Sequence, residues 1–330
     1  MQCTVHSSNP FVVTIDGFEV DVGGAGGMYV ALVFVVAILW SLVGVFVKMA
    51  STMLDSATIT FLRFAIGVLF LLALLWWKKG KLRIRGKERW VWFGAVGKSA
   101  NYFFENIGIA LGLSYGYIIG SPVGTIVVLL VMVFAFRESI SRIEWLAALV
   151  CLIGVFFVNW NGNSLDEMVS EHGAVTLLFV LSGIGYAFHV LSQKKLVQSM
   201  DAITMNVSVF FWSALITALP LPFQFEFKGT VSVSAVVSVL LLGAITGISF
   251  YMFSTALKHV PFFVAVIVSN SSVMFTVLWG WLFFKEPVSI YVVIGVLLFV
   301  AGMVTVNWPK GKARAVPVQA SATGERSRGE

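Results

Sequence analysis

The sequence has little charge and little cysteine. Only 12% of its 330 residues are charged, roughly half the share found in a soluble globular domain. Its two cysteines, Cys3 and Cys151, are too few for a disulfide framework, and redox chemistry is not expected. The phosphate-binding motif of ATPases and the H-E-x-x-H motif of zinc proteases are absent as well. These absences exclude a soluble domain, a disulfide scaffold and a directly ATP-driven pump.

Long apolar runs fill most of the chain instead. Hydrophobic residues make up 58% of the sequence, and the mean hydropathy is +0.93. A helix that crosses a bilayer needs about 20 mainly apolar residues, and ten segments meet or approach this length. They are residues 29–49, 57–77, 90–111, 115–136, 142–160, 173–194, 202–222, 233–257, 262–284 and 289–308. The sequence therefore predicts an all-α polytopic protein of the cell membrane with ten transmembrane helices.

Basic residues are concentrated in alternate connections between these spans. They lie mainly at 78–89, 137–142, 194–195, 258 and 310–328. Because Lys and Arg gather in cytoplasmic loops, both termini are predicted to be cytoplasmic and the acidic stretch Asp166–Glu171 to face outward. The formal charge of +6 then reports orientation, and nucleic acid is not an expected partner.

The spans divide the chain into five predicted segments. These are a flexible N-terminal extension (1–28), a first five-helix repeat (29–160), an external linker (161–172), a second five-helix repeat (173–308) and a disordered cytoplasmic tail (309–330). Residues 1–27 contain no Lys or Arg and no spanning apolar stretch, so a standard signal peptide is not expected there. Because the first span follows Met28 directly, we expect translation to start at Met28, which an N-terminal mass would test.

An internal repeat relates the two halves of the chain. "FRESIS" at 136–141 recurs as "FKEPVS" at 284–289, and "VNW" at 158–160 recurs at 306–308, both at an offset of 148. Earlier in the chain an offset of 146 pairs Asp55 with Asp201, Thr58 with Thr204, Lys48 with Lys194, and Ala110-Leu111 with Ala256-Leu257. Because five spans is an odd number, the second copy must enter the membrane from the opposite side. Inverted repeats around a midplane site are typical of secondary transporters, and a duplicated scaffold or enzyme is the alternative.

Several motifs carry a family resemblance. They are "LWSLVGVFVK" with Trp40 and Lys48, "LDSATITFLRF" with Arg63, "FRE" and "FKE" after spans four and nine, and the glycine-containing runs of spans five and ten. Through them the chain resembles, over 29–308, the EamA-like branch of the drug/metabolite transporter superfamily, which includes bacterial exporters of amino acids and metabolites. The resemblance implies ten spans in two inverted halves. One departure is that a proline common midway along spans four and nine is present as Pro122 but replaced by Asn270.

Charged and polar residues inside a span are expected to have a functional or structural role, because placing a charge at the bilayer centre costs about 2.5–3.5 kcal/mol. In the third span Lys98, Asn101 and Glu105 share one helix face. The functional interpretation is a cavity in which Lys98 meets a carboxylate or phosphate and Glu105 meets an amino group or a proton. The structural alternative is a network that ties helices together, with Lys98 reaching toward the interface. Arg63 in the second span is expected to anchor helices or to reach outward.

Other polar and aromatic residues are placed at similar depths. In the sixth span Ser182, Tyr186, His189 and Gln193 share a face, and a histidine there can carry a proton near neutral pH. Small polar residues stand midway along spans four and nine, where they either line a cavity or join helices. The full set predicted to bind substrate is Trp40, Lys98, Asn101, Tyr102, Glu105, Ser121, Thr125, Tyr186, His189, Tyr251, Ser269 and Asn270, with Glu105 and His189 as proton-coupling candidates and Pro122 as a hinge. Glu138 and Glu286, at the membrane edges, are expected to be structural.

The leading hypothesis is a secondary transporter that exports a small organic metabolite by alternating access. The family resemblance implies amino acids, related metabolites or amphiphilic drugs as substrates, and coupling to protons is one possibility. A nucleotide-sugar carrier fits less well, since only Lys98 and Arg63 offer positive charge within the spans. A channel, a scaffold and an intramembrane enzyme are the other classes. No metal or cofactor is expected, the state is monomer or homodimer, and Glu105→Gln is predicted to impair transport without unfolding the protein.

Overall fold

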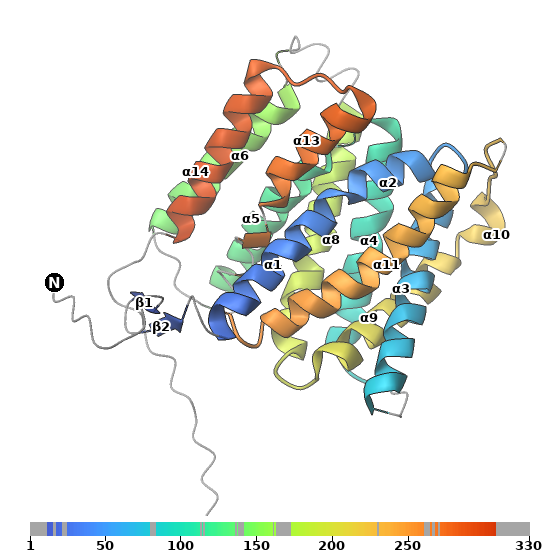
Figure 1. Ribbon diagram of the computed structural model, residues 1–330, viewed down its shortest axis with the longest axis horizontal. Coiled ribbons are helices and arrows are strands. Elements are labelled where there is room, and N and C mark those ends of the chain that lie inside the picture. The colour runs from blue at the N-terminus through green and yellow to red at the C-terminus, as the bar shows by residue number, and fades with distance from the viewer. Residues whose placement is uncertain are drawn as a thin grey trace, which may run out of the picture.

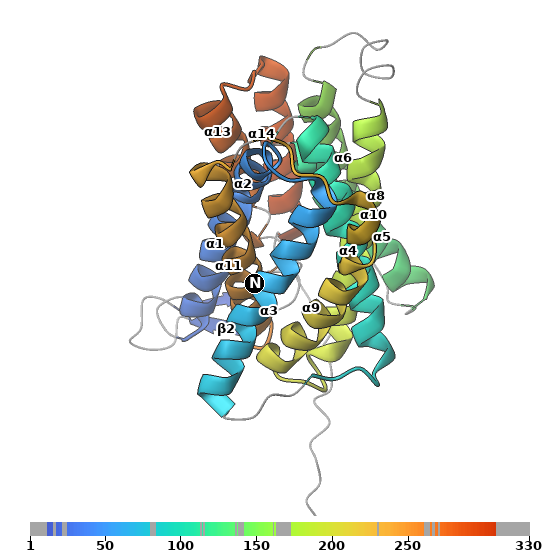
Figure 2. The ribbon, with the colours of Figure 1, turned by 90° about the vertical axis from the view of Figure 1, so that its right-hand side faces the viewer.

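The computed structural model describes most of the chain between residues 12 and 307 (Figures 1 and 2). The described residues are 12–15, 18–21, 25–79, 84–112, 114, 116–135, 137, 142–160, 162, 173–229, 231–260, 265, 268–269 and 271–307. Nearly all of them are helical. The helices are α1 (Ala25–Ser41), α2 (Val43–Ala50), α3 (Ser56–Lys79), α4 (Arg89–Leu111), η1 (Gly116–Ile119), α5 (Gly120–Phe134), α6 (Arg142–Trp160), α8 (Gly173–Leu196), α9 (Ala202–Ala218), α10 (Leu221–Gln224), α11 (Val233–Ala256), α13 (Ser272–Phe284) and α14 (Ile290–Asn307).

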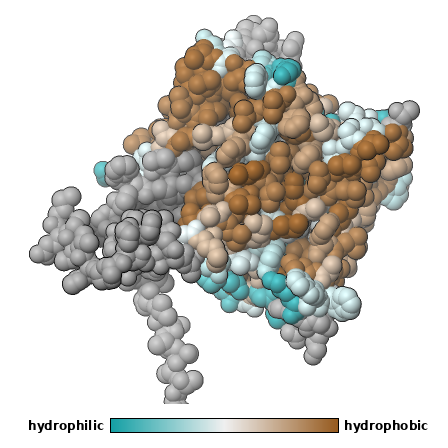
Figure 3. Space-filling view, in the orientation of Figure 1, coloured by the Kyte–Doolittle hydropathy of each residue, from teal (hydrophilic) through white to brown (hydrophobic). Residues whose placement is uncertain are grey.

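The helices have the length and composition of membrane spans. Five are long and apolar enough to cross a bilayer, namely 27–50, 56–78, 173–196, 202–223 and 233–256. Four shorter apolar helices accompany them, and α4 combines 23 residues with the buried charges of Lys98 and Glu105. On the face seen in Figure 3, apolar side chains form a broad band and hydrophilic residues gather at its lower edge. The predicted polytopic all-α membrane fold is confirmed, whereas the side on which the termini lie stays a prediction.

The N-terminal extension contains a short β-hairpin that the sequence interpretation did not include. Strands β1 (Val12–Ile15) and β2 (Phe18–Asp21) pair antiparallel, with Val12 opposite Asp21. Asp16-Gly17 stands between the two apolar runs, and this dipeptide is a strong local signal for a hairpin turn. The prediction that residues 1–28 are flexible did not take this Asp-Gly signal into account.

The contact between α6 and α14 reveals how the two copies are arranged (Figure 1). The Cys151 Sγ donates to the Phe299 carbonyl, so two residues 148 positions apart face each other. A methyl group on Gly154 would lie 2.6 Å from the Gly295 oxygen, and one on Gly302 would lie 2.9 Å from the Ala147 oxygen. Residues that follow Cys151 on α6 therefore contact residues that precede Phe299 on α14, and residues that precede Cys151 contact residues that follow Phe299. Equivalent positions meet at the centre of an antiparallel pair, which is the arrangement that an inverted repeat requires.

In the remaining pairs, too, a helix of one repeat packs against a helix of the other repeat. Helix α4 of the first repeat packs on α8 of the second. The equivalent pair is α11, the copy of α4, packed on α1 and α2, which together are the copy of α8, and α3 packs on its own copy α9. The connection after α3 meets the turn after α8 through a bond from the Ser199 hydroxyl to Glu88. At the opposite end, the Glu226 amide donates to Asp55. The structure thus brings the described part of the connection before α4, residues 84–88, to the same end of the bundle as the turn after Lys194-Lys195.

Asp55 and Asp201 occupy equivalent positions before α3 and α9. The Asp55 carboxylate accepts bonds from the Thr58 amide and hydroxyl and from the amides of Ala57 and Glu226. Partial burial raises the pKa of Asp55, but these bonds outweigh it and hold the pKa below its ordinary value. Asp201 accepts from the Thr204 amide as the N-cap of α9. The repeat therefore keeps one helix-start motif in both halves.

We expect Asp55→Ala to lower the free energy of unfolding by about 2 kcal/mol and Asp201→Ala by about 1 kcal/mol, the range of N-cap losses. Asp55 costs more because it also holds the segment before α11. Since its pKa is lowered in the folded state, the stability it contributes is present at neutral pH and is lost as the pH falls through that lowered pKa. Thermal unfolding in detergent checks both values. Equal effects of the two substitutions would contradict the extra role of Asp55.

Candidate functional site

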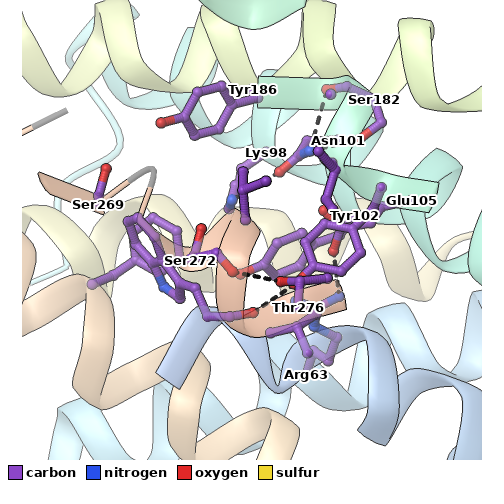
Figure 4. A pocket seen from close by; sticks show the side chains of 17 residues that line it. Arg63, Lys98, Asn101, Tyr102, Glu105, Ser182, Tyr186, Ser269, Ser272 and Thr276 are labelled. Carbon is purple, nitrogen blue, oxygen red and sulfur yellow. Dashed lines mark hydrogen bonds and ion pairs between the residues drawn. The ribbon is translucent and has the colours of Figure 1, made fainter. Parts of the chain in front are cut away.

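A cavity opens in the middle of the bundle, where α1, α3, α4, α8, α11 and α13 converge (Figure 4). Its volume is about 100 Å³, which is smaller than the roughly 300–1,000 Å³ of typical small-molecule sites. The lining residues are Trp40, Val43, Arg63, Lys98, Asn101, Tyr102, Glu105, Tyr117, Ile118, Gly120, Ser182, Tyr186, Phe250, Ser269, Ser272, Val273 and Thr276. Both halves of the repeat contribute, as a midplane site between inverted copies requires.

Lys98 places a positive charge in the wall of this cavity. The residue is only 2% exposed, so its ammonium does not reach the membrane interface. The Lys98 Nζ donates to Asn101 Oδ1 at 2.8 Å and lies over the rings of Tyr102 (4.1 Å) and Phe250 (4.4 Å). No carboxylate of the described residues lies within salt-bridge distance of it. The aromatic faces stabilise the cation, and an acceptor from a bound molecule would complete its hydrogen bonding.

Arg63 and Glu105 form a buried ion pair beside Lys98. The Arg63 Nη1 lies 3.0 Å from Glu105 Oε1 and 2.7 Å from Asn106 Oδ1, and the Asn106 amide donates to Thr60. The side chain of Arg63 is 1% exposed, so it anchors helices and does not reach outward. Its guanidinium carbon lies 3.5 Å from the centroid of Tyr102. Because Arg63 neutralises Glu105, the cavity keeps one net positive charge, that of Lys98.

The first span is interrupted at the cavity, between α1 and α2. The Tyr117 hydroxyl lies 3.0 Å from the Trp40 carbonyl and 2.9 Å from the Thr276 hydroxyl. The Trp279 indole donates to the Ser41 hydroxyl at 2.9 Å. Side chains from η1 and α13 thus take up polar groups at a break in the helix ladder, as a membrane interior requires. The Trp40 indole donates in turn to Ser249, which fixes its ring in the cavity wall.

Close approach of α4 and α8 brings their polar residues together. A methyl group on Gly185 would lie 2.6 Å from the Gly97 oxygen, so only glycine allows this spacing. One turn away, the Asn101 amide donates to the Ser182 hydroxyl at 2.8 Å (Figure 4). Asn101 therefore links Ser182 to Lys98 and sets the direction of the ammonium.

Seven of the twelve predicted binding residues line the cavity. They are Trp40, Lys98, Asn101, Tyr102, Glu105, Tyr186 and Ser269. His189 lies behind the wall, 0% exposed and edge-on to Phe250. Tyr251 accepts a hydrogen bond from the exposed Lys78, near the end of α3, and Thr125 is not among the lining residues. These three residues are therefore not placed to touch a molecule in the cavity of this conformation.

The remaining predictions concern the middle of spans four and nine. Pro122 is the third residue of α5, after the 3₁₀ turn η1. A proline in the first turn of a helix forfeits no helical hydrogen bond, so the structure places it near a helix start and not midway along a regular helix. The side chain of Ser121 and the whole of Asn270 lie outside the described residues. The hinge role of Pro122 stays a prediction.

Residues Gly112–Gly116 read G-L-S-Y-G, the G-x-S-x-G spacing of many serine hydrolases. In those enzymes the serine stands between a strand and a helix. Here Ser114 lies between α4 and η1, and its hydroxyl donates to Glu286 at 2.7 Å. The hydroxyl is therefore committed to a carboxylate, and the local structure is not that of a nucleophile elbow.

Sequence reasoning missed several residues of the cavity wall. Tyr117, Phe250 and Thr276 were not singled out, because a tyrosine, a phenylalanine and a threonine in apolar spans have ordinary packing roles. Ser182 was noted only as part of a polar face, and Ser272 only as part of a polar run. The periodicity of a single helix shows which residues share a face, but it does not show which neighbouring helix that face meets.

Comparison with known proteins identifies the chain. The model of the EamA-like transporter family matches residues 27–160 and again residues 174–308. The protein belongs to the EamA-like transporter family. A solved structure described as "Crystal structure of protein" resembles it with a TM-score of 0.66 at 17% identity, covering 85% of this chain and 98% of that one. At this identity the likeness shows the fold alone.

A curated relative matches part of this EamA-like chain. It is the Multidrug resistance protein EbrA of Bacillus subtilis (strain 168), which is 35% identical over 63 residues. The match takes in 19% of this chain and 60% of the relative, so the chain spans less than two thirds of that protein's length. Membership of the family makes the protein a multi-pass membrane transporter and agrees with the resemblance in its motifs.

Proposed function

We propose that this EamA-like protein is a secondary transporter that exports small organic metabolites carrying a carboxylate, such as amino acids or related amphiphilic compounds. Lys98 is the observation that carries the proposal. Its ammonium lies in a central cavity, with aromatic rings around it and no carboxylate of the described residues within reach. A buried charge without an ionic partner is costly, and a substrate carboxylate would supply that partner.

The rest of the cavity suits the other parts of such a substrate. Trp40, Tyr102, Tyr186 and Phe250 provide aromatic walls for an apolar body. The N-terminus of α13 adjoins the cavity through Ser272, and its N-cap residue Ser271 makes no capping bond with its side chain. Backbone amides at a helix start favour an anion. A carboxylate between Lys98 and this helix end would therefore meet donors on both sides.

Proton coupling remains a hypothesis with two unequal candidates. Glu105 is held by Arg63 at 3.0 Å, so its carboxylate already has an ionic partner. His189 is buried and has no hydrogen-bond partner for either ring nitrogen among the described residues. We therefore favour His189 over Glu105 as the proton carrier.

Counterflow from proteoliposomes tests the proposal. Vesicles loaded with a cell metabolite extract are diluted with and without a pH gradient, and metabolites are measured by mass spectrometry against protein-free vesicles. We expect saturable, selective loss of carboxylate-bearing metabolites and acceleration by the same metabolite on the far side. A channel would give flux without counterflow. Movement of cationic drugs in place of carboxylates would favour a drug exporter, the activity that the printed name of EbrA suggests.

A further inference from the structure

A second hollow lies on the outside of the bundle, between α3 and α11. Its walls are apolar except for one hydroxyl, and they consist of Phe70, Leu71, Ala73, Leu74, Trp77, Gly247, Ile248, Tyr251 and Met252. Its volume is about 480 Å³, within the roughly 300–1,000 Å³ of small-molecule sites. Among the described residues, none lines both this hollow and the central cavity. We call it the α3–α11 groove.

Glycines at the crossing of the two helices create the groove. A methyl group on Gly247 would lie 2.9 Å from the Gly67 oxygen, and one on Gly67 would lie 3.2 Å from the Gly243 oxygen. Small residues let two backbones approach closely, and beyond this contact α3 and α11 diverge toward their C-terminal ends (Figure 1). Phe70 and Ile248 in the groove walls are exposed. In a bundle of membrane spans, such exposed apolar walls face the acyl chains of lipid.

A cation stands at the end of this apolar groove. The Lys78 Nζ donates to the Tyr251 hydroxyl at 2.7 Å and lies 5.1 Å from the centroid of its ring. The exposed Lys78 is therefore turned across to α11, whereas a lysine that only reached for water would extend away from the protein. The neighbouring Trp77 is 80% exposed, and tryptophans at the ends of spans mark the headgroup level of a membrane. The groove thus runs from apolar depth to a cation at that level.

Lys78 and Tyr251 together offer donors without an acceptor. The ammonium keeps two further protons, and the Tyr251 hydroxyl keeps its own because its oxygen accepts the bond from Lys78. Of the ion pairs in the described part of the chain, none includes Lys78. A phosphate group presents several anionic oxygens to donors of this kind. The connection that begins at Lys78 is also strongly basic, with seven Lys and Arg residues at 78–89, which favours an anion at this end of the groove.

We propose that the α3–α11 groove binds an anionic phospholipid, with one acyl chain in the groove and the phosphate on Lys78 and Tyr251. The charge pattern predicts this end to be cytoplasmic, and basic pockets between helices on that side suit anionic headgroups. A zwitterionic lipid brings a cation of its own to Lys78 and binds less tightly. The site goes beyond the proposed transport function. It lies behind the cavity wall, because Tyr251 in the groove follows Phe250 in the cavity on α11.

Native mass spectrometry of the full chain in detergent tests the headgroup. The protein is titrated with dioleoylphosphatidylglycerol or dioleoylphosphatidylcholine, and binding of the first lipid is measured. We expect tighter binding of phosphatidylglycerol, and Lys78→Gln should weaken it about ten-fold, the effect of one lost charge-assisted bond. Lys258→Gln is the matched control, because Lys258 is exposed in the turn after α11 and does not line the groove. An equal loss in both variants would overturn the site and show only a diffuse attraction to the basic end.

Two tryptophan variants test the acyl chain. Ala73→Trp fills an exposed position of the groove, whereas Leu69→Trp places the same ring one turn away on α3, at an exposed position that does not line it. We expect Ala73→Trp to remove the tight binding of phosphatidylglycerol and Leu69→Trp to retain it. Undiminished binding in the Ala73→Trp protein would show that the chain does not lie in the groove, and would overturn the proposal.

Tyr251→Phe and a headgroup without chains complete the test. Tyr251→Phe keeps the apolar wall, so it should weaken binding of phosphatidylglycerol while the unfolding temperature in lipid-free detergent stays unchanged. Undiminished binding in both Tyr251→Phe and Lys78→Gln would refute the phosphate contact. Phosphatidylglycerol should raise the unfolding temperature of the parent chain, since a ligand of the folded state stabilises it. An equal rise with glycerol phosphate would identify a site for free phosphate compounds and contradict the assignment to a lipid.

Discussion

Glu105→Gln is expected to lower the free energy of unfolding by about 3 kcal/mol, because removing one partner of a buried ion pair leaves the other charge uncompensated. Arg63 is 1% exposed and lies 3.0 Å from Glu105, so water cannot replace the lost carboxylate. Thermal unfolding in detergent measures the change, with an expected fall on the order of 5–10 °C. From the sequence alone, Glu105→Gln was predicted to leave folding intact. The ion pair with Arg63 leads us instead to expect a destabilised protein.

A double-mutant cycle separates this pair from a general loss of packing. Arg63→Gln alone should destabilise by a similar amount, whereas Arg63→Gln combined with Glu105→Gln should cost clearly less than the sum of the two. Strict additivity would show that the two side chains do not interact. Transport should also be impaired in the Arg63→Gln variant, because Tyr102 packs against Arg63 at 3.5 Å and loses its support.

Lys98→Met is expected to reduce carboxylate counterflow by about 30- to 100-fold, the worth of a hydrogen-bonded charge pair with a substrate. Methionine keeps the length of the side chain and its contact with Tyr102 and Phe250. Since it also removes a buried charge that has no ionic partner among the described residues, we expect stability to stay equal or to rise. A loss of transport with gained stability is the pattern of a binding residue.

Lys258→Met serves as the matched control for Lys98→Met. Lys258 is an exposed lysine in the turn after α11, so the same substitution there should leave counterflow and unfolding temperature unchanged. Equal transport by the Lys98→Met protein and the parent chain would refute the role of Lys98. Loss of transport of neutral and carboxylate metabolites alike would show that Lys98 shapes the cavity and does not recognise the anion.

The architecture was largely determined by the sequence. Apolar runs of about 20 residues can only be buried in lipid or in a very large core, and their number and the offsets of 146 and 148 led to two inverted copies. The contact of Cys151 with Phe299 shows this relation directly. Asp55 and Asp201 were visible as matched positions because a helix start depends on a few neighbouring residues.

The tertiary structure decided which polar residues meet. Helix periodicity placed Lys98, Asn101 and Glu105 on one face, but it could not show that Arg63 neutralises Glu105 or that aromatic rings from α4 and α11 surround Lys98. It also could not show that Glu286 belongs with Lys48, 238 positions away. Local sequence fixes the backbone of each helix and the side chains that share a face. The partner of a charge depends on which helices pack together, and that is set by contacts distant in the chain.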